Sequence, residues 1–82
     1  MKFILYIKND CDYCIEAVKE LKIRNIDFDI FVMERHFSMW PELKKIYNWD
    51  TVPMIFEVVG KRDYKLVGGY IDLMNRLESE DL

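Results

Sequence analysis

Hydrophobic and polar positions alternate with different periods along the chain, and these periods predict the elements of its first half. Residues 2–7, apolar from Phe3 onward, indicate a short strand buried on both faces. From about Asp12 to about Asn25 the period is helical, with one apolar face made by Cys14, Ala17, Val18 and Leu21. Residues 27–32 alternate between charged and apolar, which suits an edge strand with Phe28, Ile30 and Val32 on one side.

The second half predicts a helix, a hairpin and a last helix. Ser38 is the expected N-cap of the first of these helices, which carries Pro41 in its first turn and ends at Asn48. Residues 54–59 and 64–67 flank the turn 60–63 as two strands of a β-hairpin. The last helix is expected from Tyr70 to about Leu77, followed by a solvated acidic end at 78–81. The apolar faces of the two helices are predicted to be Leu43, Ile46 and Tyr47 for the first and Ile71, Met74 and Leu77 for the last.

The element order β-α-β-α-β-β-α predicts the fold class. A parallel first pair of strands, joined by a right-handed crossover and followed by an antiparallel hairpin, gives a four-stranded mixed sheet flanked by three helices on its two faces. This is an α/β fold of the thioredoxin-like kind, and residues 1–82 are expected to form one domain.

Composition narrows the class of protein further. A chain of 82 residues with 51% hydrophobic and 33% charged residues is typical of a globular domain. Its formal net charge of −3 argues against nucleic acid as a partner, because phosphate binding needs a basic surface. No apolar run approaches the roughly 20 residues of a membrane span. We therefore expect a cytoplasmic monomer that binds neither nucleic acid nor membranes.

The chain has two cysteines, Cys11 and Cys14, three positions apart at the start of the first predicted helix. A bridge across two residues closes too small a loop to add much stability, so redox chemistry or metal binding is the better explanation. Unpaired N–H groups and the positive end of the helix dipole favour a thiolate at Cys11, and Lys8 adds a cation nearby. Burial favours the neutral thiol at Cys14. Cys11 is therefore the predicted nucleophile and Cys14 the resolving cysteine.

Two other interpretations of the cysteine pair stay open at this point. Structural zinc needs four ligands, and His36 is the only histidine, so one chain cannot close a site made of cysteine and histidine alone. We expect no metal site within the chain. The pair could also be two inert buried cysteines at a chance spacing.

Three motifs together resemble the glutaredoxin family over nearly the whole chain. They are Cys11-Asp12-Tyr13-Cys14 with Lys8 before it, then Thr51-Val52-Pro53, and then the run from Gly68-Gly69 to Leu73. The resemblance implies a glutathione-disulfide oxidoreductase that reduces protein disulfides and glutathione mixed disulfides. Its partners would be glutathione, as the cosubstrate, and disulfide-containing or glutathionylated proteins.

The resemblance also implies a glutathione site. The family's cis-proline loop would be Thr51-Val52-Pro53, whose Val52 backbone could pair with glutathione like an added strand. Backbone N–H groups at the start of the last helix would hold the γ-glutamyl carboxylate, and Asp72 the amine. Asp72 could instead simply stabilise the first helical turn, and Pro53 could simply start a strand. The implied binding residues are Lys8, Tyr13, Thr51, Val52, Pro53, Gly69, Tyr70, Ile71 and Asp72.

This sequence departs from the commonest family pattern at three positions. Asp12 stands where proline is usual, Asp50 where a basic residue is frequent, and Trp40 where a polar residue is common. The last two changes leave Lys8 and Lys44 to meet the glycine carboxylate of glutathione, and weak binding is expected. Relatives that lack the proline suggest an alternative, a glutathione-ligated [2Fe–2S] cluster held between two chains. A redoxin reduced by thioredoxin reductase is a further alternative.

Aromatic residues away from these motifs are predicted to be structural. Trp40, Trp49, Phe37 and Phe56 are expected in the core or covering the surface. His36 is expected to be a loop residue.

Overall fold

The structure, a computed structural model, describes residues 1–35, 38, 40–49 and 51–80. The predictions for His36, Phe37 and Asp50 lie outside these residues. The elements in chain order are β1 (Lys2–Ile7), α1 (Asp12–Ile23), β2 (Asp27–Val32), α2 (Trp40–Tyr47), β3 (Met54–Val58), β4 (Tyr64–Gly68) and α3 (Tyr70–Glu80).

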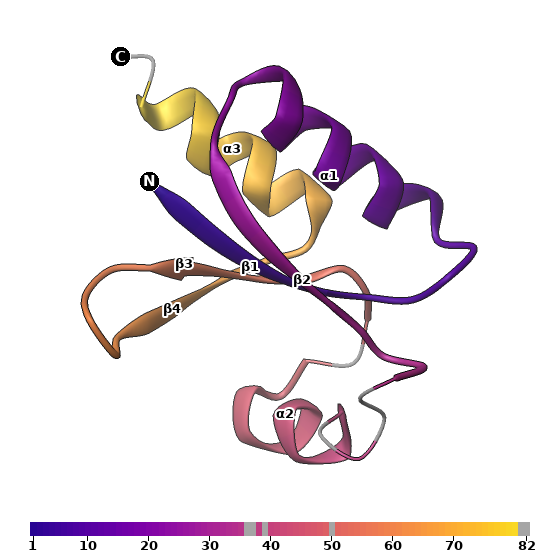
Figure 1. The fold of residues 1–82 in the computed structure, drawn as a ribbon. Helices are drawn as coiled ribbons and strands as arrows, with labels where there is room; N and C mark the ends of the chain where they lie inside the picture. Colours follow the sequence, from indigo (N-terminus) through magenta and orange to yellow (C-terminus); the bar gives the residue numbers. More distant parts are fainter. Residues whose placement is uncertain (36–37, 39, 50, 81–82) are drawn as a thin grey trace.

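The four strands form one mixed sheet in the order β2-β1-β3-β4. β1 and β2 run parallel, with Phe3 opposite Phe28, whereas β3 is antiparallel to both β1 and β4. Helices α1 and α3 lie side by side on one face of the sheet, and α2 lies on the other (Figure 1). The predicted fold class and the edge position of β2 are confirmed.

The main core lies between the sheet and the α1–α3 layer. It consists of Phe3 and Leu5 from β1, Ala17 and Leu21 from α1, Ile55 from β3, and Leu73 and Leu77 from α3. Alternation along β1 sends Ile4 and Tyr6 to the opposite face, where α2 covers them only partly. The prediction that this strand is buried on both faces is therefore right for the face toward α1 and α3 only.

One residue of each predicted helix face is exposed. In α3, Leu77 is buried as predicted, but Ile71 is 66% exposed and Leu73 is buried in its place. Ile71 lies two positions before Leu73, about 200° away around the helix, so the two side chains cannot face the same layer. Ile46 of α2 is 70% exposed for a similar reason, because the neighbouring Tyr47 faces the sheet and stacks edge-on against Phe56.

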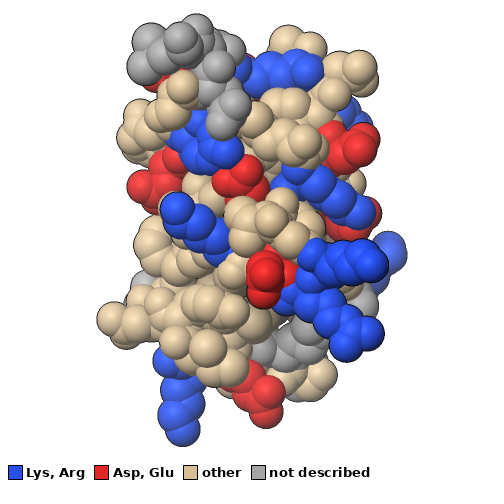
Figure 2. All heavy atoms as spheres, turned by 90° about the vertical axis from the view of Figure 1, so that its left-hand side faces the viewer, with Lys and Arg blue, Asp and Glu red and all other residues tan. Residues whose placement is uncertain are grey.

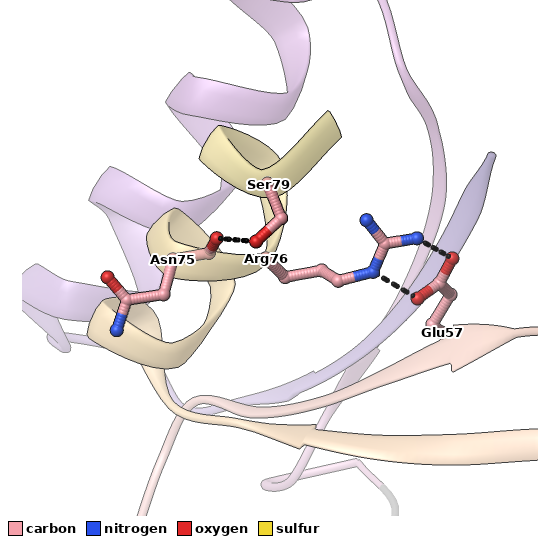
Figure 3. A network of polar contacts seen from close by, with 4 residues as sticks. All are labelled: Glu57, Asn75, Arg76 and Ser79. Atoms are coloured by element: carbon pink, nitrogen blue, oxygen red, sulfur yellow. Dashed lines mark hydrogen bonds and ion pairs between the residues drawn. The ribbon is translucent and has the colours of Figure 1, made fainter. Parts of the chain in front are cut away.

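Several element ends also differ from prediction. Ser38 is not the N-cap of α2, because that helix begins at Trp40, two residues later. β3 ends at Val58, and β4 extends through Gly68. The last helix continues to Glu80, and its final turn includes a bond from the Ser79 hydroxyl to the Asn75 carbonyl, 3.0 Å long (Figure 3).

An ion pair fixes α3 against the sheet. Arg76 donates from Nε and Nη2 to the two carboxylate oxygens of Glu57 on β3, both at 2.8 Å (Figure 3). This bidentate arrangement fits the planar guanidinium to the carboxylate, and Glu57 is only 12% exposed. The pair therefore sets the position of α3, whose first turn contributes to the site described next.

Basic and acidic side chains are mixed on the face drawn in Figure 2, and neither kind forms a large continuous region there. No helix within the described ranges has the length and apolarity needed to cross a membrane.

Candidate active site

The two cysteines lie at the N-terminus of α1 in different environments. Cys11 is the N-cap residue with an extended backbone (φ −114°, ψ 108°), and its Sγ accepts a hydrogen bond of 3.2 Å from the Cys14 N–H. Its carbonyl accepts the first helical bond, 3.1 Å from the Ile15 N–H. The sulfur of Cys11 thus takes the place of a capping oxygen, at the electropositive end of the helix.

Cys11 and Cys14 form a disulfide bond, with their Cα atoms 5.2 Å apart. Cys11 is partly exposed, whereas Cys14 is 1% exposed and packs on the apolar side of α1. Solvent therefore reaches the sulfur of Cys11 more easily than that of Cys14.

The loop before β3 meets the cysteine pair. The peptide bond between Val52 and Pro53 is cis, as the resemblance implied. The Val52 carbonyl oxygen lies 3.9 Å from the Sγ of Cys11, although 41 positions separate the two residues. Pro53 is buried, so the tertiary fold holds this backbone beside the sulfur.

The turn from β4 into α3 forms another wall of the site. Gly68 has a φ of +126°, a conformation that residues with a side chain rarely adopt. Asp72 reaches back from the first turn of α3, and its Oδ2 accepts a 2.9 Å hydrogen bond from the Gly69 N–H. The N–H groups that follow Gly69 have no partner within the helix, because they belong to its first turn. Asp72 therefore does cap the helix, and the turn it stabilises presents backbone donors.

These three segments surround a groove of about 430 Å³, which we call the cis-proline groove. Its lining consists of Tyr13, Thr51, Val52, Pro53, Gly69, Tyr70, Ile71 and Asp72. The rings of Tyr13 and Tyr70 meet across it with centroids 5.9 Å apart. The exposed Ile71, wrongly predicted to face the core, contributes an apolar side chain here. The structure thus brings together all the residues predicted for glutathione binding except Lys8.

Lys8 lies elsewhere around the cysteine pair. It lines one groove with Cys14 and another with Trp40, and neither groove includes the loop at Val52. The backbone after it is held by a 2.8 Å hydrogen bond from the Asn9 N–H to Glu34.

Trp49 is a neighbour of the site that sequence reasoning treated as structural only. A methyl group on Gly69 would lie 3.7 Å from Cζ2 of Trp49, so the indole lies beside the start of α3. Its Nε1 is buried without a hydrogen-bond partner among the described residues. No local motif marks this position, because its place depends on how the segment after α2 returns to the sheet.

Within the part of the chain that the structure describes, no three or more His, Cys, Asp or Glu side chains are grouped to hold a metal ion. A cluster shared by two chains, with glutathione as ligand, stays a prediction, as does reduction by thioredoxin reductase.

Comparison with known proteins gives a family and a fold. The family model described as Glutaredoxin matches residues 3–62, which include both cysteines and the loop at Pro53 but not the turn at Gly68. No curated protein matched the sequence.

Solved structures agree with the family match. Glutaredoxin 1 from Francisella tularensis, solved in complex with cacodylate, is 22% identical with a TM-score of 0.70, over 95% of this chain and 93% of that one. A glutaredoxin from Brucella melitensis is 26% identical with a TM-score of 0.70, over 98% of this chain and 80% of that one. A thioredoxin-like protein is 21% identical with a TM-score of 0.69, over 92% and 97% of the two chains.

Proposed function

The chain belongs to the glutaredoxin family of thiol–disulfide oxidoreductases, and we propose that it uses glutathione to reduce protein disulfides and glutathione mixed disulfides. The observation that carries this proposal is the position of Cys11. Its sulfur caps α1, accepts a hydrogen bond from the Cys14 N–H and lies 3.9 Å from the carbonyl oxygen of Val52, a residue that lines the cis-proline groove. In the reduced protein the same N–H and helix end favour a thiolate, which is the attacking species in disulfide exchange.

The reaction follows from the two cysteine environments. The Cys11 thiolate attacks one sulfur of a substrate disulfide, forms a mixed disulfide and releases the other sulfur as a thiolate. Cys14, freed of its proton, then attacks Sγ of Cys11 and releases the second substrate sulfur. Two electrons pass to the substrate, and the Cys11–Cys14 disulfide that results is the bond present in the structure. Two glutathione thiols then reduce it and leave as glutathione disulfide.

Glutathione fits the chemistry of the cis-proline groove. An extended peptide beside Val52 could exchange backbone hydrogen bonds with its N–H and C=O. The γ-glutamyl carboxylate would meet the N–H groups of the first turn of α3, where the helix dipole favours an anion. One oxygen of Asp72 is used by Gly69, and we assign the other to the γ-glutamyl amine. A reducing compartment rich in glutathione, such as the cytoplasm, would supply the cosubstrate.

Two cysteine variants test the proposed roles. Cys11→Ser should abolish reduction of a glutathione mixed disulfide in an assay coupled to glutathione reductase. Cys14→Ser should keep that activity, because the second glutathione can attack the mixed disulfide at Cys11 directly. Equal loss in both variants would contradict the assignment of nucleophile and resolving cysteine.

The identity of the reductant needs a separate measurement. The oxidised protein should be reduced by glutathione and should accept electrons from thioredoxin reductase at a much lower rate. If thioredoxin reductase reduces the protein faster than glutathione does, glutathione dependence is rejected, but the proposal that the protein catalyses disulfide exchange still stands.

A further inference from the structure

A second groove reaches the cysteine pair from the other side of α1. It has a volume of about 420 Å³ and lies between α1, the end of β1 and the edge strand β2. Its lining consists of Ile7, Lys8, Asn9, Asp10, Cys14, Ile15, Val18, Lys19, Lys22 and Ile30. We call it the α1–β2 groove. It shares no lining residue with the cis-proline groove among the residues described.

The floor of the α1–β2 groove is apolar and partly open to solvent. Ile15 on α1 is 56% exposed and Ile30 on β2 is 38% exposed, and Val18 lies between them half-buried. The α1 residues of the lining fall at positions 14, 15, 18, 19 and 22, which form one stripe along the helix. An apolar strip of this kind suits a polypeptide better than a nucleic acid backbone.

The rim of this groove is positive, although the whole chain has a net charge of −3. Three lysines, Lys8, Lys19 and Lys22, line it against one acidic residue, Asp10. Glu16 lies 3.7 Å from Lys19, but both side chains are at least half exposed, so solvent weakens that pair. Glu34 also lies near this rim, because its carboxylate accepts the Asn9 N–H, but the lining itself carries three lysines against Asp10 alone and therefore favours acidic groups.

We propose that the α1–β2 groove holds an acidic, partly apolar segment next to the disulfide of a protein substrate. This proposal rests on the function proposed above and adds a partner chemistry to it. Glutathione is a tripeptide and, bound as proposed above, would end within the cis-proline groove, whereas a polypeptide joined to Cys11 must continue beyond the sulfur. The α1–β2 groove begins at Cys14, so it offers the continuing chain apolar contacts and three ammonium groups.

A pair of peptide disulfides tests this selection. The two peptides share their length and apolar residues, and carry either acidic residues or lysines beside the cysteine. The protein is reduced beforehand with dithiothreitol and mixed with each peptide in a single turnover at low ionic strength. The wild type should react about tenfold faster with the acidic peptide, because opposite charges raise the association rate.

Charge reversal in the groove should remove the preference. The double variant Lys19→Glu with Lys22→Glu should react about equally with both peptides or prefer the lysine peptide. Its matched control is Lys61→Glu with Arg62→Glu, which makes the same change of net charge in the exposed β3–β4 turn, far from the start of α1 (Figure 1). The control should keep the tenfold preference. The milder double variant Lys19→Gln with Lys22→Gln should show a preference for the acidic peptide that is weaker than that of the wild type and stronger than that of the reversal variant. It takes the place of the reversal variant if circular dichroism shows that the reversal variant is unfolded.

The outcomes separate this proposal from the proposed function. If the groove variant and the control variant change the peptide preference equally, only the total charge of the protein matters, and the proposal for the α1–β2 groove is overturned. Stronger inhibition by a single-stranded oligonucleotide than by a cysteine-free acidic peptide of equal charge would also overturn it. Failure of glutathione to reduce the oxidised protein would reject the cosubstrate but not the groove, because dithiothreitol is the reductant in this assay.

Discussion

Gly68 is the residue at which one added methyl group should do the most damage to the site. Its φ of +126° is strained for any residue with a Cβ, at a cost of about 1–3 kcal/mol. The added Cβ would also overlap the Asp72 carboxylate, with Cγ only 2.7 Å away. Asp72 would have to move and give up its hydrogen bond to Gly69, which costs about 1 kcal/mol more. Gly68→Ala should therefore lower the free energy of unfolding by about 2–4 kcal/mol.

Gly69 is the matched control for this substitution. A methyl group there would lie 3.7 Å from Trp49 Cζ2 and 3.8 Å from the Pro53 carbonyl oxygen, which are ordinary contact distances. Gly69→Ala should therefore change the free energy of unfolding by less than about 1 kcal/mol. Urea denaturation followed by circular dichroism measures both variants on one scale.

A double-mutant cycle separates the two causes of the cost at Gly68. In an Asp72→Ala background the overlap with the carboxylate is gone, so Gly68→Ala should cost only the backbone strain. The reasoning is refuted if Gly68→Ala and Gly69→Ala are equally destabilising. It is also refuted if the cost at Gly68 is the same with and without Asp72.

Three further predictions concern packing and titration elsewhere. Arg76→Met should lower the free energy of unfolding in urea by about 1–3 kcal/mol, because it leaves the largely buried Glu57 carboxylate without its bidentate partner; an effect below about 0.5 kcal/mol would contradict this. Leu73→Ala should cost about 2–5 kcal/mol in the same assay and Ile71→Ala under about 0.5 kcal/mol, and the reverse order would show that the faces of α3 are misassigned. Burial raises the pKa of Tyr6 above 10.0, so folding favours the neutral form of its side chain. This stabilisation is complete below about pH 10 and is lost as the pH rises through the pKa that Tyr6 has in the folded protein. Tyr6→Phe should flatten the fall in stability above about pH 10, and identical pH profiles for the two proteins would reject the assignment.

Local patterns were sufficient to predict the fold and the cysteine that caps the first helix. Apolar positions recur with a period of two in a strand and near 3.6 in a helix, and both periods can be read from neighbouring residues. The spacing of Cys11 and Cys14 after a strand likewise fixes which cysteine caps the helix, because capping involves only the next three residues. The motif at Pro53 came from family resemblance and not from physics, since sequence gives little basis for a cis bond.

The exposure of individual apolar residues on the helices was predicted less well, as for Ile71 and Ile46, and the reason is physical. The α3 sequence offers apolar residues at 70, 71, 73, 74 and 77, more than one helix face can bury. Which of them point inward depends on where Arg76 meets Glu57 and on how Gly68 turns the chain. With these tertiary contacts in place, the side chain of Ile71 stays exposed and lines the cis-proline groove.

By itself, then, the sequence determined the elements, their order and the position of Cys11 as helix cap, because each depends on residues within about one helical turn. Only the tertiary structure decided what surrounds that pair. Sheet order brings Val52 to within 3.9 Å of Cys11 across 41 positions, and directs Lys8 to the opposite side of α1, away from the cis-proline groove. Contacts between distant segments depend on how whole layers pack, and no short stretch of sequence contains that information.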